Sequence, residues 1–144
     1  MESILTSIKK MLGIAEEYEH FDQDIIMHIN STLMGLTQMG VGPSNGFSIE
    51  DDTSLWTDFV KDTNKIQAVK SYIFLKVRLL FDPPTSSSVI ESYNRMISEY
   101  EWRLNVAAES DENQMEDEQV DTALDKITEL INHYMSGGEN GDVQ

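Results

Sequence analysis

The residues best suited to hold a metal ion are Glu17 and His20, which form a Glu-x-x-His pair. Di-iron helical bundles use this spacing because it places a carboxylate and an imidazole on the same face of a helix. Such a centre needs a second Glu-x-x-His pair and two further glutamates on other helices. The sequence contains no second pair. We therefore interpret Glu17 and His20 as surface residues near a helix start, and predict neither a metal nor a cofactor.

Other catalytic patterns are also missing from the sequence. No serine lies in a Gly-x-Ser-x-Gly turn, and there is no Walker phosphate-binding loop. The segment GVGPSNG at 40–46 lacks the spacing of a dinucleotide fingerprint and predicts a turn. Carboxylates are abundant, but no pattern pairs two of them for acid–base chemistry. We therefore predict that the protein is not an enzyme.

The charge of the chain is strongly acidic and unevenly distributed. The 144 residues carry a formal net charge of −16. Residues 107–144 hold 11 acidic residues and one basic residue, a net of −10, whereas residues 1–106 hold 15 acidic and nine basic residues, a net of −6. Affinity for nucleic acid through phosphate contacts needs clustered Lys and Arg, so this balance disfavours DNA binding. The chain has no cysteine, which excludes disulfides and thiolate metal sites.

Apolar residues recur at helical spacing along most of the chain. The only weak strand candidate is 47–49, so the fold class is all-α: a small bundle of about four to five helices plus a tethered C-terminal amphipathic helix. Asp82-Pro83-Pro84 must end one long helix, because proline lacks an amide donor and restricts the residue before it. The helices are expected at 3–12, from 21–24 to 39, near 55–60, from 62 or 63 to 81, from 88 to about 106, and at 119–136.

Four segments follow from this pattern. Residues 1–106 form a helical domain, and residues 107–118 (AAESDENQMEDE) are aperiodic and acidic, which is typical of a mobile linker. Residues 119–136 form a C-terminal docking helix, and residues 137–144 are expected to be a disordered tail. No apolar run is long enough to span a membrane.

The helix predicted to end at Phe81 is apolar on more than one face. Ile66, Val69, Tyr72, Ile73, Val77 and Leu80 form its main stripe, and Phe74, Leu75 and Leu79 fall outside it. Such a helix either lies at the centre of the bundle or has a second face covered by a partner. On the second interpretation, we predict a subunit interface formed by Tyr72, Phe74, Leu75, Lys76, Arg78, Leu79, Arg95, Trp102 and Arg103.

Several segments of the chain are similar to one family. They are ILTSIKKMLGI, FDQDIIMHINSTL, Trp56-Thr-Asp-Phe59 and, above all, VKSYIFLKVRLLFDPPTSSSVIESYNRMISEYEWRLNV. Together, up to Val106, they resemble the head–tail connector (adaptor, or head-completion) proteins of long-tailed bacteriophages, in which a long helix, a Phe-Asp-Pro-Pro corner and a Glu-Trp-Arg-Leu ending recur.

The resemblance implies a small helical bundle whose copies form a ring, typically twelve-fold, beneath the portal at one capsid vertex. Such a ring is made in the host cytoplasm and lies in the neck of the virion. It docks on the portal protein, extends the DNA channel and presents a surface for tail-completion or stopper proteins. DNA passes through without specific binding, and no membrane is involved.

The final helix lies beyond the resemblance. Its stripe consists of Val120, Leu124, Ile127, Ile131 and Tyr134, and predicts docking on the portal or a neighbouring subunit, because connector families use C-terminal segments to grip the portal. Whether it docks within its own chain or on another is open. An alternative function is a small acidic phage regulatory or DNA-mimicking module that binds a basic protein. Such a regulator would remain monomeric or dimeric, whereas a connector would form higher oligomers.

Overall fold

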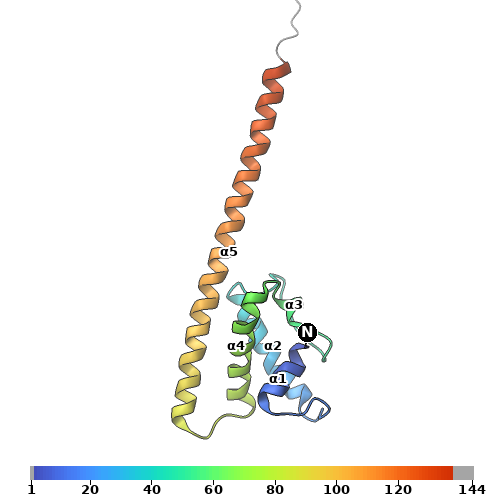
Figure 1. Ribbon diagram of the computed structural model, residues 1–144, viewed down its shortest axis with the longest axis vertical. Helices are drawn as coiled ribbons and strands as arrows, with labels where there is room; N and C mark the ends of the chain where they lie inside the picture. The colour runs from blue at the N-terminus through green and yellow to red at the C-terminus, as the bar shows by residue number, and fades with distance from the viewer. Residues whose placement is uncertain (1, 138–144) are drawn as a thin grey trace, which may run out of the picture. The chain divides into compact units, whose positions relative to one another are not determined.

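A computed structural model describes residues 2–137 (Figure 1). Within this range the chain has no β-strand, which confirms the all-α prediction; residues 47–49 are not a strand. The described helices are α1 (Ile4–Leu12), α2 (Asp22–Gln38), α3 (Trp56–Phe59), α4 (Thr63–Phe81) and α5 (Ser87–Ser136). The chain divides into two compact units, unit 1 (Met1–Ala108) and unit 2 (Glu109–Gln144), and α5 contributes to both.

The start and end of α1 are set by two small residues. The Ser3 side chain accepts a hydrogen bond from the backbone N–H of Thr6 at 3.1 Å, so Ser3 is the N-cap rather than the first helical residue. Gly13 ends the helix with φ of 79°, a left-handed conformation that glycine adopts readily. The predicted helix end at residue 12 is confirmed.

The start of α2 differs from the expected capping. The sequence suggests that Asp22 or Asp24 caps the helix, but the N-cap is Phe21 and no side chain bonds the free amides there. Asp22 is held elsewhere, because its carboxylate forms an ion pair with Lys9 Nζ at 2.8 Å. Both aspartates lie in the first turn, where negative charge favours the helix dipole.

The proline corner joins α4 to α5. Asp62 caps α4, accepting a hydrogen bond from the N–H of Asn64 at 2.9 Å, and the helix ends at Phe81 as predicted. After the corner, α5 begins at Ser87, one residue before the expected start. Figure 1 shows α4 and the first part of α5 running alongside each other in opposite directions.

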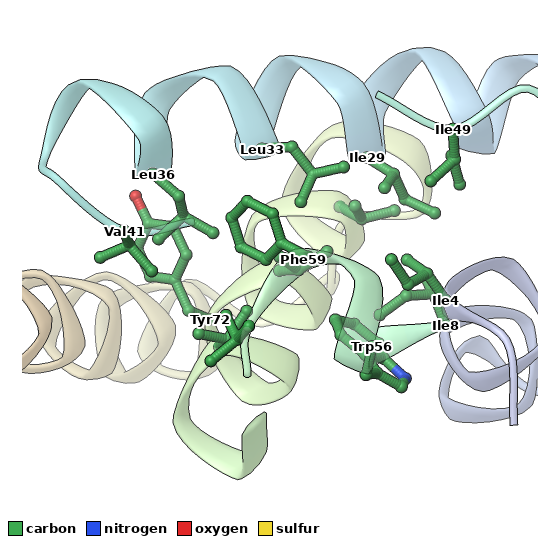
Figure 2. Packing of buried hydrophobic residues seen from close by; sticks show 14 of the residues in the cluster. Ile4, Ile8, Ile29, Leu33, Leu36, Val41, Ile49, Trp56, Phe59 and Tyr72 are labelled. Atoms are coloured by element: carbon green, nitrogen blue, oxygen red, sulfur yellow. The ribbon is translucent and has the colours of Figure 1, made fainter. Parts of the chain in front are cut away.

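Unit 1 has one continuous apolar core. Figure 2 shows Ile29, Leu33 and Leu36 of α2 turned toward Phe59 and Tyr72. The indole Nε1 of Trp56 donates a hydrogen bond to Ser7 Oγ at 3.0 Å, which fixes α3 against α1. Leu80 was expected in the main stripe of α4, but 57% of its surface is exposed. The largest fully buried side chains are Ile4, Leu5, Ile8, Ile25, Ile29, Leu33, Leu36, Ile49, Trp56, Val69, Ile73 and Val77.

Residues 107–118 are helical rather than the non-helical link that the sequence suggests. They belong to α5, which runs without a break from Ser87 to Ser136. Ala, Glu, Gln and Met in this segment are strong helix formers, and no Gly or Pro interrupts it. In this segment the lack of an apolar stripe therefore reflects a helix that is exposed to solvent, not the absence of a helix. The assignment of this segment as a tether stays a prediction, and of the tail expected at 137–144, residues 138–144 lie outside the described residues.

Candidate assembly surfaces

A group of ionisable side chains surrounds Lys9. Its Nζ donates a hydrogen bond to the carbonyl oxygen of Glu16 at 2.8 Å and pairs with Asp22, and its side chain is 3% exposed. A pocket of about 240 Å³ lies beside it, with Glu19 and the acidic residues 50–52 in its wall. Lys9 thus has a structural role, joining the end of α1 to the start of α2. Within residues 2–137, no three His, Asp or Glu side chains are arranged to hold a metal ion.

The interface residues predicted on α4 divide into buried and half-buried groups. Tyr72 and Leu75 are each 3% exposed and belong to the core of unit 1, so they do not lie on a surface of the isolated chain. Phe74 and Leu79 are half-buried and pack against that core. The extra apolar residues of α4 therefore follow chiefly from its central place among the helices of unit 1.

Lys76 and Arg78, the two basic residues of α4 predicted at the interface, interact with other residues of unit 1. Lys76 Nζ lies 5.8 Å from the centre of the Tyr72 ring, a favourable cation–π distance. Arg78 Nη1 donates to Asp82 Oδ2 at 2.8 Å, one turn further along the chain. Both side chains are half-buried, and neither needs a partner subunit to explain its position.

The other residues predicted to form the subunit interface lie on α5 in unit 1 and are exposed: Arg95, Trp102 and Arg103. Arg95, Glu99, Trp102 and Val106 recur at intervals of four, three and four, so they share one side of the helix; we call them the Trp102 face. Trp102 is 68% exposed and Val106 is 40% exposed. Arg103 pairs with Glu99, and Arg95 Nη2 donates to Ser92 Oγ at 3.3 Å. An exposed Trp flanked by Arg is typical of a protein–protein contact.

A second exposed face in unit 1 was missed by the sequence interpretation. Met27, Ser31, Met34 and Gln38 have the same four-three-four spacing on α2, and we call them the Met34 face. Met27 and Met34 are 59% and 60% exposed. Their spacing of seven residues, on the side of α2 away from its buried stripe, is the sequence signal that identifies them. Exposed Met is common at adaptable binding surfaces.

The predicted docking residues all lie in unit 2 and are all exposed. Val120, Leu124, Ile127, Ile131 and Tyr134 have exposed fractions between 52% and 86%. Leu130 and Met135 are also exposed, at 66% and 77%, and widen the apolar surface beyond the predicted stripe. Every residue from 109 to 137 is exposed, so the apolar side chains of this segment face solvent in the isolated chain.

Comparison with known proteins assigns a family to unit 1. Residues 4–111 match the family described as phage connector protein. The chain belongs to the phage connector family. The match covers α1 to α4 and the first half of α5, and it confirms the family suggested by the sequence segments. Neither the curated proteins nor the solved structures contain a significant match.

Membership gives this connector protein a general role. The family consists of structural proteins of the phage particle, which act together with other structural proteins such as the portal, and its setting is the neck of the virion. None of the helices within residues 2–137 combines the length and apolar character needed to cross a membrane. The segment from residue 112 onward lies outside the family match.

Proposed function

We propose that this connector protein forms a homo-oligomeric ring that docks on the portal, extends the DNA channel and offers an attachment surface to tail-completion or stopper proteins. The observation that carries the proposal is the family match over residues 4–111, which includes nearly all of unit 1. Twelve copies, the usual number in connector rings, are expected in the neck of the virion.

The two exposed faces of unit 1 support a ring. A ring closes through heterologous contacts, in which one surface of each subunit meets a different surface of the next. The Trp102 face on α5 and the Met34 face on α2 are two such surfaces, and each places large exposed apolar side chains in its centre. We expect Trp102 of one copy to lie against Met27 and Met34 of its neighbour. Burial of these side chains supplies the driving force for assembly.

The acidic charge supports passage of DNA without retention. Every phosphate that a cationic side chain contacts adds affinity, and many such contacts would hold the packaged genome in the channel. With a net charge of −16 per copy, a ring of these subunits repels the DNA backbone overall. We therefore expect no measurable binding of duplex DNA at physiological salt.

The test is the mass and shape of the assembly. The full chain is mixed with the portal protein encoded by the same phage genome, and the products are measured by native mass spectrometry and electron microscopy. We expect a ring of about twelve copies seated on the portal, as in the family that it resembles. A chain that remains monomeric or dimeric with portal, and instead binds basic proteins, would overturn the proposal and favour the acidic regulatory module.

A further inference from the structure

The exposed apolar surface of unit 2 has the geometry of a helix that packs against other helices. Its central residues Val120, Leu124, Ile127, Ile131 and Tyr134 are spaced alternately by four and three, the repeat of coiled coils. Ala123, Leu130 and Met135 extend the surface to an arc of about 140° at 3.6 residues per turn, wider than a strict two-helix seam. We call these eight residues the C-terminal apolar face.

We propose that the C-terminal apolar face packs in parallel against the same face of neighbouring copies of this chain. The proposal rests on the proposed function, because rotation about a ring axis brings equivalent segments side by side in the same direction. The width of the arc suits a helix that touches a neighbour on each side. This part of α5 has no buried residue in the isolated chain, so contact with other copies would also stabilise it.

The placement of charge favours a second copy over a basic partner. In a parallel pair of helices, the positions that flank the seam lie opposite each other across it. From 119 to 136 these positions are Ala123, Thr128, Leu130 and Met135, with Asp121 as the single charged residue. Few like charges would therefore lie opposite each other across the contact between two copies.

The other acidic residues of this segment stand away from the apolar face. Asp125 and Glu129 lie on the far side of the helix, where they would not reach the rim of a groove that holds the face. A partner that uses Lys or Arg around an apolar groove would be matched by acidic residues beside the face, as charge complementarity requires. The observed arrangement lacks them, apart from Asp121.

The acidic stretch that precedes the face opposes the contact. Six of the ten residues from 109 to 118 are acidic, and in parallel helices these carboxylates approach one another. Salt screens such exposed charges, with a Debye length of about 8 Å at physiological ionic strength. Self-association through the face should thus strengthen as salt rises, whereas docking on a basic protein should weaken.

Cysteine cross-linking tests the proposal directly, because the natural chain has no cysteine. Val120→Cys, Ile127→Cys and Tyr134→Cys are made singly in the full chain, with Glu129→Cys as the matched control on the far side of the helix. A disulfide needs Cα atoms within about 7 Å, a separation that equivalent seam positions reach where two parallel helices face each other through the seam. We expect the three seam variants to form covalent dimers under mild oxidation, in solution and on the portal, and the control to form few.

The outcomes separate this proposal from the proposed function. A ring on the portal without cross-links at the seam would overturn the C-terminal contact and leave the ring standing. Cross-linking in a mixture of Val120→Cys and Tyr134→Cys chains, but in neither of these variants alone, would indicate antiparallel helices and also overturn it. Cross-linked seams in a chain that never forms a ring would support the contact and overturn the proposed function.

A matched pair of charged variants gives a second readout. Leu124→Glu introduces a carboxylate into the seam, and Thr122→Glu introduces the same group on the far side of the same helix. We expect Leu124→Glu to weaken self-association at least about tenfold, because a buried carboxylate lacks a partner, and Thr122→Glu to leave it nearly unchanged. Equal effects, or association that weakens with added salt, would contradict the proposal.

Discussion

The hydroxyl of Tyr72 on α4 donates a hydrogen bond to Glu101 Oε1 on α5, with 2.9 Å between the oxygens. Tyr72 is almost fully buried, and the bond joins two residues separated by the proline corner. Ile97 and Leu104 of α5 are buried in the same core. The bond therefore fixes the register of the first part of α5 against α4, and with it the position of the Trp102 face.

Removal of the Tyr72 hydroxyl should destabilise unit 1 without changing its fold. Tyr72→Phe keeps the ring and loses the bond, so we expect a loss of about 1–2 kcal/mol, since the acceptor is a carboxylate. Urea unfolding followed by circular dichroism measures the change. Tyr18→Phe is the control, because Tyr18 is 49% exposed. An unchanged free energy of unfolding in Tyr72→Phe would contradict the role given to this bond.

The same bond predicts a loss of stability in alkaline solution. Burial, together with the bond to Glu101, raises the pKa of the Tyr72 hydroxyl above its ordinary value. Its contribution is fully present below the unfolded pKa of about 10 and is lost as pH rises beyond it, because the unfolded chain then ionises more readily. The free energy of unfolding should fall more between pH 9 and about pH 11.5 for the natural chain than for Tyr72→Phe. Parallel curves would be evidence against this assignment.

Two glycines of the loop after α2 should respond very differently to alanine. Gly42 and Gly46 both have positive φ, of 86° and 89°, so alanine strains the backbone at either position by about 1–2 kcal/mol. An added Cβ meets open space at Gly46 but collides with the Phe59 ring at Gly42. We expect Gly42→Ala to cost clearly more than Gly46→Ala in thermal unfolding. Equal costs would show that the Phe59 ring moves aside freely.

The ion pair between Lys9 and Asp22 should contribute more to stability than the exposed ion pair between Lys10 and Glu2. Lys9→Met removes a buried cation, leaves Asp22 without its partner and should cost about 2–3 kcal/mol. Adding Asp22→Asn should cost little more, because the interaction is already lost. Lys10→Met is the control, since Lys10 pairs with Glu2 at an exposed site. A double-mutant cycle, measured by urea unfolding, gives the coupling energy between Lys9 and Asp22. If the effects of Lys9→Met and Asp22→Asn simply add, the two residues are not coupled and the prediction is wrong.

The helices were predicted correctly where the apolar periodicity agreed with the residues that start or end a helix. Asp62 and the prolines after Asp82 act locally, so the start and end predicted for α4 were correct to within a residue. Asp22 was misassigned because its carboxylate pairs with Lys9, a residue 13 positions earlier. Such a contact depends on how α1 and α2 pack, which local pattern does not reveal.

The candidate surfaces were harder to predict than the helices. The extra apolar residues of α4 indicated either a core or an interface, and the packing of Tyr72 and Leu75 supports the core. The Met34 face was missed because two methionines among polar residues form a weak pattern. The helical conformation of residues 107–118 was missed for another reason. A helix without an apolar stripe forms because of the helix propensity of its residues, so it leaves no periodic apolar pattern in the sequence.

The ring proposed above predicts that exposed residues control assembly without controlling the fold. Trp102→Glu and Met34→Glu each place a carboxylate in the contact expected between neighbouring copies, where it would lose its hydration. We expect both variants to keep the thermal stability of the natural chain, because these side chains are 68% and 60% exposed, and to lose most of the ring on the portal. Asn94→Glu adds the same charge to α5 away from the Trp102 face and should assemble normally. Native mass spectrometry with portal measures the ring, and normal assembly of both face variants would show that subunits meet through other surfaces.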